Sequence, residues 1–558
     1  MDVANQESLA FTMSERSTPS VIFHNFDHVL RLVGAFGRYQ LAFVLVMQIT
    51  VVVLCGNFVF MAYASYEPTV TCHLNHSDSI TLNYNHKRTF CDLYQNGNCT
   101  HVQWQAPFRT LIQEWHLICS NDDKAQLINT ITVCGTVAAS AVGYLADAFG
   151  RKTLFCISYS SLLLFSSLSL AAADWLTFAL CRFLVGAALS ASLTMNFVWG
   201  MEMTDPKHNF LLNLSSLWHF GYMFTALLAY VTTDWRSYLG TLSLIGSPVL
   251  FVAGLCFVES PRWLVQTGKL DKAANLLNRM AQFNRSYTNT LITAENLAAI
   301  PHSEHRRSIK SHFLTLLTTR SLLIYLLLLS LLTFSTASFA TAFIFEVSVL
   351  PGSPFLKFFC YGFFRLTVPL VLYVCDARLP WFGRRHIVLC ALTAVLFFYG
   401  LALMAYSVSE HSSAAFGALI SGAIICNFLW TAIGQYQMEL FPTFLRNTAA
   451  SVSNVIDPLA AAIMPQLVYR QQSWNWPGLP LWWAELWGVA ALLIGYWLLP
   501  ETKGRPLPDK VETVQAIYEE HAKVRNWEDS WIYWSTLCCY GENVEPIENV
   551  EVPNEELA

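Results

Sequence analysis

The chain has 558 residues, of which 54% are hydrophobic and only 13% are charged. A water-soluble protein of this size needs a charged surface of roughly a quarter of its residues, so this composition excludes a soluble globular protein and predicts a surface that largely faces lipid. The net charge of −5 disfavours nucleic acid as a partner, and the cysteines show no paired C-x-x-C spacing that would predict a metal site.

The first 35 residues contain no continuous apolar run followed by a cleavage site, so we expect no cleaved signal peptide and a cytosolic N-terminus. Beyond them, apolar segments of about 18 to 25 residues recur, each long enough to cross roughly 30 Å of hydrocarbon as a helix. They predict twelve transmembrane helices, near 40–62, 125–146, 153–172, 175–199, 210–231, 236–257, 321–345, 355–376, 386–407, 413–437, 448–468 and 481–499.

A polar segment at 63–123 interrupts the series after the first helix. It contains two N-glycosylation sequons, at Asn75 and Asn98, and four cysteines, which allow three disulfide pairings; these are Cys72, Cys91, Cys99 and Cys119. Disulfides and N-glycans both form on the non-cytosolic side of a membrane. We therefore expect this loop to be extracellular, glycosylated and disulfide-bonded.

A second polar segment, at 258–319, is rich in lysine and arginine and poor in acidic residues. Basic residues that flank membrane helices mark the cytosolic side. An even number of helices then places both termini in the cytosol and leaves the sequons at Asn213 and Asn284 unused. The predicted organisation is a cytosolic N-terminal segment, a six-helix bundle, a cytosolic connector, a second six-helix bundle and a cytosolic tail, at 1–39, 40–257, 258–319, 320–499 and 500–558.

Short motifs repeat at equivalent places in the two predicted bundles. Gly143–Lys152 follows the second helix, as Asp376 with Gly383-Arg-Arg385 follows the eighth. Glu259-Ser-Pro-Arg262 follows the sixth helix, as Pro500–Arg505 follows the twelfth. This repetition predicts two pseudo-symmetric halves that arose by duplication.

Acidic and basic residues occur together in these cytosolic motifs. They are expected to form a latch that closes in one conformation and opens in another, and the alternative is a set of positive-inside anchors without a switching role. The expected pairs are Asp147 with Arg151, Glu259 with Arg262, and Glu439 with Arg446.

An ordered set of motifs resembles the organic cation/anion/zwitterion transporter family (solute carrier family 22) of the major facilitator superfamily. The motifs are Gly37–Gln40, Glu114-Trp-His-Leu-Ile-Cys119, Gly143–Lys152, Arg182-Phe-Leu-Val-Gly186, Glu259–Leu264, Glu439–Asn447 and Leu499–Gly504. The resemblance implies the major facilitator fold, a multi-pass protein of the plasma membrane, and a central cavity for a small organic substrate.

One acidic residue, Asp457, is predicted at mid-membrane, about ten residues into the segment 448–468. Charges within membrane helices are costly and mark functional sites. Ser453 and Asn454 share its helix face, and Pro458 leaves the carbonyl of Asn454 without its helical donor. These groups favour a bound cation. By resemblance, cation transporters of the family carry an aspartate here, whereas anion and carnitine transporters tend to carry arginine.

Arg365, predicted at a similar depth in 355–376, leaves three interpretations open. Asp457 binds a simple cation, or Asp457 and Arg365 together bind a zwitterion, or the two pair with each other and neither meets substrate. By resemblance, Trp218 and Phe345 line the cavity, where an aromatic face contributes about 0.5 to 2 kcal/mol to cation binding. Trp430 and Gln437 are further candidates.

These features together predict a polyspecific transporter of small organic cations that works by alternating access. An inside-negative potential of 100 mV favours entry of a monovalent cation by about 2.3 kcal/mol, so facilitated diffusion needs no coupling ion or cofactor. The alternative of another class is a non-transporting receptor or sensor with the same fold. An enzyme is not expected, because no nucleophile, base and orienting group occur together in the sequence.

Overall fold

The computed structural model describes most of the chain. The described residues are 23, 26–34, 36–73, 79–81, 87–99, 101–139, 145–204, 217–286, 292–298, 300, 309–349, 352–379, 383–408, 413–474, 476–503, 508 and 511–525.

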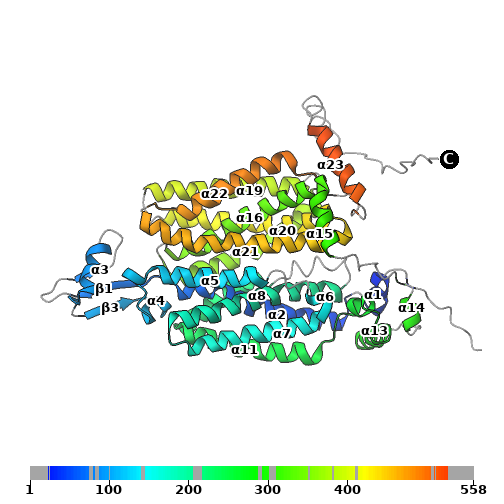
Figure 1. The fold of residues 1–558 in the computed structure, drawn as a ribbon, viewed down its shortest axis with the longest axis horizontal. Coiled ribbons are helices and arrows are strands. Elements are labelled where there is room, and N and C mark those ends of the chain that lie inside the picture. Colours follow the sequence, from blue (N-terminus) through cyan, green and yellow to red (C-terminus); the bar gives the residue numbers. More distant parts are fainter. Residues whose placement is uncertain are drawn as a thin grey trace, which may run out of the picture.

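Two helical bundles lie side by side, as Figure 1 shows with one above the other. Long helices dominate because polar backbone groups away from water must form their hydrogen bonds within each segment. The N-terminal half contains α2 (Arg38–Ala64), α5 (Asp123–Ala139), α6 (Leu145–Phe149), α7 (Arg151–Leu168), α8 (Trp175–Met203), α10 (Trp218–Thr232) and α11 (Trp235–Cys256). The C-terminal half contains α16 (Arg320–Val349), α17 (Pro354–Arg365), α18 (Thr367–Arg378), α19 (Arg384–Val408), α20 (Ser413–Leu440), α21 (Thr443–Trp474) and α22 (Leu479–Leu498).

Each of the twelve predicted spans overlaps one or two of these helices. Within the described part of the chain, nine helices are long and apolar enough to cross a membrane. The other three predicted spans fall on α5 and α10, described over 17 and 15 residues, and on α21, which contains Asp457 and two prolines. Leu366 separates α17 from α18 within the eighth span.

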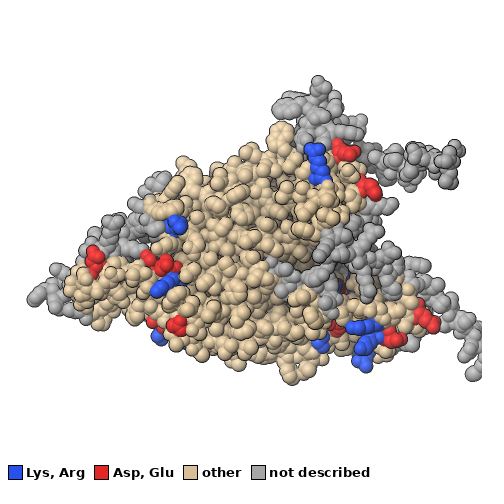
Figure 2. Space-filling model, in the orientation of Figure 1, with Lys and Arg blue, Asp and Glu red and all other residues tan. Residues whose placement is uncertain are grey.

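The outer surface matches a protein that crosses a bilayer. Large apolar side chains such as Leu244 (73% exposed), Phe251 (67%) and Met404 (69%) point outward along the bundles. In Figure 2 the charged side chains gather towards the two ends of the molecule and leave the middle uncharged. The burial of apolar surface in lipid therefore replaces the polar coat of a soluble protein.

At one end of the bundles, which we call the loop face, the first loop forms a small folded unit (left in Figure 1). Its antiparallel sheet has the strand order β2-β1-β3 and was not predicted. Disulfides join Cys72 to Cys99 and Cys91 to Cys119, which selects one of the three possible pairings. The elements are β1 (Thr69–His73), β2 (Ser79–Thr81), α3 (Lys87–Gln95), β3 (His101–Gln105), α4 (Leu111–Glu114) and η2 (Cys119–Asn121).

Glu114 ties this loop to the bundle. Its carboxylate accepts the indole N–H of Trp235 at 2.7 Å and pairs with Arg236, which also donates to the backbone carbonyls of Leu170 and Ala172. Burial alone would raise the pKa of Glu114, but the hydrogen bonds from Arg236 and Trp235 outweigh burial and lower it. The loop is therefore fixed to the first residues of α11.

The opposite end, which we call the connector face, carries short helices (right in Figure 1). They are α1 (Phe26–Gly34), α12 (Pro261–Gln266), α13 (Leu270–Asn284), α14 (Ala294–Ala298), α15 (Ile309–Thr318) and α23 (Val511–Arg525). Asn284 holds α13 against the start of α2: its amide donates to the carbonyl of Val33 at 3.0 Å and accepts the N–H of Tyr39 at 2.9 Å. A Cβ at position 37 would lie 2.3 Å from the side chain of Asn284, so a residue larger than glycine would clash there. The side chain of Asn284, the asparagine of this sequon, is therefore held by hydrogen bonds within the protein.

Candidate substrate-binding site

The two halves meet near the loop face through aromatic side chains. The ring of Tyr63 on α2 lies 6.0 Å from that of Phe355 and 5.1 Å from that of Phe358, both on α17. Tyr230 on α10 lies 5.8 Å from Phe355. These contacts close the space between the halves towards the loop face.

Two further contacts extend this closure. The side-chain amide of Gln466 on α21 donates to the hydroxyl of Thr130 on α5 at 2.9 Å. On α17, Gly362 faces α10 so closely that a Cβ there would lie 2.8 Å from the carbonyl oxygen of His219 and 2.9 Å from Cβ of Tyr222. The halves are therefore in backbone contact at this point.

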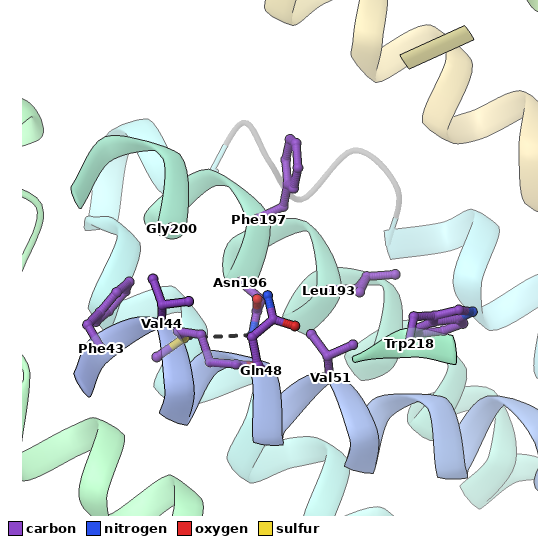
Figure 3. A pocket seen from close by; sticks show the side chains of 10 residues that line it. Phe43, Val44, Gln48, Val51, Leu193, Asn196, Phe197, Gly200 and Trp218 are labelled. Carbon is purple, nitrogen blue, oxygen red and sulfur yellow. Dashed lines mark hydrogen bonds between the residues drawn. The ribbon is translucent and has the colours of Figure 1, made fainter. Parts of the chain in front are cut away.

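A cavity of about 200 Å³ opens between α2, α8 and α10 (Figure 3). Its wall is mainly apolar, with the side-chain amides of Gln48 and Asn196 facing it. Asn196 donates to the carbonyl of Met47 at 3.0 Å, and Gln48 accepts the N–H of Leu217 at 2.7 Å. Lining residues reach Gly200, three residues before the connector-face end of α8, so the cavity extends towards that face.

Trp218, predicted from the sequence, forms part of this wall at the start of α10. Its ring lies 5.6 Å from that of Phe58 and 6.5 Å from that of Tyr222. Its carbonyl accepts the thiol of Cys55 at 3.5 Å. The indole is thereby fixed at the border between the cavity and the closed region.

Asp457 lies near the middle of α21, 14 residues after its first residue and 17 before its last. Its side chain is half-buried. No residue in the described part of the chain forms an ion pair or hydrogen bond with this carboxylate. A carboxylate without a cationic partner inside a membrane protein is costly unless a ligand neutralises it.

Arg365 is buried at 6% exposure and spans the two halves. Its guanidinium lies 4.8 Å from the ring of Tyr361 and 5.6 Å from that of Tyr222 on α10. It donates to the hydroxyl of Tyr361 at 2.7 Å and to the side-chain oxygen of Asn427 on α20. The nitrogen of Asn427 in turn lies 3.1 Å from His219. No carboxylate of the described residues pairs with Arg365, so the pairing of Arg365 with Asp457 does not occur in this conformation.

Of the residues predicted to bind substrate, Trp218 lines this cavity, whereas Asp457, Arg365, Phe345, Trp430 and Gln437 do not. Phe345 on α16, and Trp430 and Gln437 on α20, are half-buried. Their role in binding stays a prediction. Sequence reasoning missed Gln48 and Asn196, although amides within apolar helices are a readable signal.

At the connector face, the predicted gate residues of the N-terminal half take partners within that half. Arg151 pairs with Glu202 at 2.9 Å, while Glu259 accepts the backbone N–H groups of Arg151 at 2.8 Å and Lys152 at 2.9 Å. The expected pairing of Glu259 with Arg262 is wrong, because Glu259 caps the start of α7 and Arg262 pairs with Asp27 of α1. The side chain of Asp147 lies outside the described residues.

The C-terminal half repeats this arrangement. Glu439 pairs with Arg384 at 3.4 Å and accepts the hydroxyl of Thr502, rather than taking Arg446 as its partner. Glu501 accepts the backbone N–H groups of Arg384 at 2.8 Å and of Arg385 at 3.2 Å. Arg446 donates to the carbonyl of Phe441 at 3.5 Å. The described contacts of both networks tie helices together within one half.

The arrangement of two helical bundles agrees with comparisons to known proteins. A family model described as sugar (and other) transporter matches residues 119–513. The chain belongs to that transporter family. A solved structure of the proton:xylose symporter XylE bound to 6-bromo-6-deoxy-D-glucose superposes with a TM-score of 0.56 at 16% identity, over 85% of this chain and 99% of the symporter. The predicted major facilitator fold with its two six-helix halves is thereby confirmed.

Curated relatives confirm the resemblance to solute carrier family 22. Solute carrier family 22 member 4 of Mus musculus is 26% identical, over 73% of this chain and 72% of its own length. Organic cation/carnitine transporter 2 of Rattus norvegicus is 26% identical over 72% and 71%. The steroid transmembrane transporter SLC22A24 of Microcebus murinus is 27% identical over 75% of each chain. The chain is thus a multi-pass membrane transporter and not an enzyme, while its relatives differ in the cargo that their names state.

Proposed function

We propose that this transporter carries small organic cations across the plasma membrane by alternating access, with Asp457 as the counter-charge of the cargo. The connector face is then cytosolic and the loop face extracellular. The observation that carries the proposal is the carboxylate of Asp457, which has no basic partner among the described residues. A cation that reaches Asp457 would neutralise this charge.

The accessibility of the two buried charges favours a cation over an anion. Asp457 keeps partial exposure, whereas Arg365 is enclosed by the rings of Tyr222 and Tyr361 and by Asn427. Asp457 is therefore the more accessible of the two charges in this conformation. Trp218 adds an aromatic face, and the mainly apolar wall suits the organic part of varied cations.

The closed loop side and the cavity on the connector side support alternating access. Tyr63, Phe355 and Phe358 close the path to the loop face, while the cavity extends towards the connector face. This is the geometry of a cytosol-open state in a transporter that rocks its two halves about a central site. Entry of a cation would follow the membrane potential.

Uptake of tetraethylammonium into expressing cells tests the proposal. Asp457→Asn keeps the side-chain shape and removes the charge, so uptake is expected to fall at least tenfold at equal surface expression. Asp271→Asn, an exposed acid on α13, is the matched control and should transport normally. Normal uptake by Asp457→Asn would remove Asp457 from the site, and binding without uptake in the unmodified chain would favour a receptor or sensor.

A zwitterion is the second candidate, because Arg365 also lacks a carboxylate partner among the described residues. Opening of the halves towards the loop face would separate Arg365 from Tyr222 and free the guanidinium for a carboxylate. The name of the rat relative, which includes carnitine, agrees with this possibility. Arg365→Gln should spare tetraethylammonium and reduce uptake of carnitine if the cargo is a zwitterion, whereas equal effects on both compounds would exclude that reading.

A further inference from the structure

A second pocket lies at the connector face, apart from the central cavity. It has a volume of about 540 Å³, and α6 and α7 form one wall while α12 and α13 form the other. Figure 2 shows basic side chains gathered at this end of the N-terminal half, where Figure 1 places α13. The transport mechanism assigns no role to this pocket.

Three cations face the pocket without a counter-charge. Lys269, Lys272 and Arg279 are exposed, line the pocket, and form no ion pair with any described residue. Lys272 and Arg279 are seven residues apart and share one face of α13. The ammonium of Lys269 lies 4.6 Å from the ring of Trp263, which holds it at the pocket wall.

The one carboxylate in the wall does not neutralise these cations. An oxygen of Glu259 accepts the backbone N–H groups of Arg151, Lys152 and Ser260 at 2.8 to 3.0 Å. Those bonds fix it at the start of α7, where the helix dipole favours a negative charge. The pocket therefore has three cations and one carboxylate, and that carboxylate is already hydrogen-bonded to the backbone. The net positive charge suits a multiply charged anion.

The rim of the pocket leads to lipid rather than to open water. Phe149 is 61% exposed, and Thr153 follows it on the outer face of α7, where Ile157 is 55% exposed one turn further on. This surface continues into the apolar belt of the bundle. A ligand with an anionic head and acyl chains therefore satisfies both parts of the pocket, whereas a soluble phosphate would meet only the basic part.

We propose that this pocket binds the headgroup of a polyphosphorylated inositol lipid in the cytosolic leaflet, with Lys269, Lys272 and Arg279 as its phosphate contacts. The choice of leaflet rests on the orientation given under the proposed function. The lipid would bridge α7 to α13. Since α13 also holds α1 and the start of α2 through Asn284, occupancy fixes the connector on the N-terminal half.

The test is binding of a fluorescent short-chain phosphatidylinositol 4,5-bisphosphate to the purified full chain in detergent micelles, followed by thermophoresis. The variant Lys272→Gln/Arg279→Gln is expected to bind about thirty-fold more weakly, since each basic side chain near an anionic lipid contributes about fivefold. The control is Arg320→Gln/Arg378→Gln, which removes two exposed basic residues from the C-terminal half and should bind like the unmodified chain.

Each other outcome overturns the proposal. Undiminished binding by the Lys272/Arg279 variant, or equal losses in both variants, would show that general electrostatic attraction and not this pocket holds the lipid. Competition by soluble inositol trisphosphate as strong as by unlabelled short-chain lipid would assign the pocket to a soluble anion. Tetraethylammonium uptake is measured in parallel, so a failure of lipid binding is distinguished from a failure of the transport proposal.

Discussion

Alternating access predicts a specific effect for a side chain added at Gly362. In this conformation a Cβ there would lie 2.8 Å from the carbonyl oxygen of His219 and 2.9 Å from Cβ of Tyr222, across the boundary between the halves. Neither the backbone carbonyl nor a Cβ can move away as the far end of a flexible side chain can. Gly362→Ala therefore penalises the conformation closed towards the loop face and leaves the opposite conformation unaffected.

The expected size of this effect follows from overpacking, which costs about 1 to 3 kcal/mol. A penalty on one of two states shifts their ratio by the same free energy, here roughly five- to 150-fold. The ratio of transporters open towards the loop face to those closed towards it should rise by that factor. Uptake should fall, because the transporter no longer returns readily to the state open at the connector face.

Labelling of Phe358→Cys by an impermeant maleimide reports this shift. Phe358 is fully buried against Tyr63 here and becomes accessible when the halves open. Labelling should be at least fivefold faster when Gly362→Ala is added. The control is Gly434→Ala on α20, where a new Cβ would meet no atom within 4 Å. Equal labelling rates with and without Gly362→Ala would refute the reasoning.

Two further predictions concern stability. Glu501→Gln should lower the thermal unfolding midpoint by roughly 2 to 6 °C, since hydrogen bonds to a charged group contribute about 1.5 to 3 kcal/mol; the exposed Glu295→Gln should have no effect. Burial would raise the pKa of Glu501, but hydrogen bonds from His386 and backbone N–H groups lower it. The stabilisation that the Glu501 carboxylate provides is therefore complete above its unfolded-state pKa and is lost as pH falls. The difference in unfolding midpoint between wild type and Glu501→Gln should shrink below about pH 4. A difference that stays constant with pH would contradict this. Cys72→Ser should reduce surface expression, because the Cys72–Cys99 bond closes a segment of 27 residues. Closing a segment of that length stabilises the folded state by about 3.5 kcal/mol. Mass spectrometry that finds Cys72 linked to Cys91 or Cys119 in the unmodified chain would contradict the pairing.

The membrane helices follow directly from the sequence because apolar length is a one-dimensional signal. The mid-membrane position of Asp457 was equally readable, because it depends only on the number of residues from the start of an apolar segment. Its role in binding stays a prediction. Two-fold repetition of the short motifs that now lie at the connector face also correctly placed equivalent networks in both halves. Glu259 and Glu501 cap the starts of α7 and α19 in the same way.

Pairings between distant residues did not follow from the sequence. The four loop cysteines permit three pairings, and only the sheet that places β1 beside β3 decides between them. Glu259 and Arg262 are only three residues apart in sequence, yet each has a partner contributed by another helix. The environment of Arg365 depends on α10 and α20, which are more than 60 residues away, and so could not be read from its own helix.

Titration calorimetry of tetraethylammonium into the purified transporter tests the role of Asp457 without the complications of flux. A carboxylate and an ammonium 4 Å apart attract each other by up to about 4 kcal/mol at an effective dielectric constant of 20, before the costs of desolvation. Asp457→Asn is therefore predicted to weaken binding at least tenfold, which is about 1.4 kcal/mol, with the unfolding midpoint retained. An unchanged dissociation constant in Asp457→Asn would contradict the assignment of Asp457 as the cargo's counter-charge.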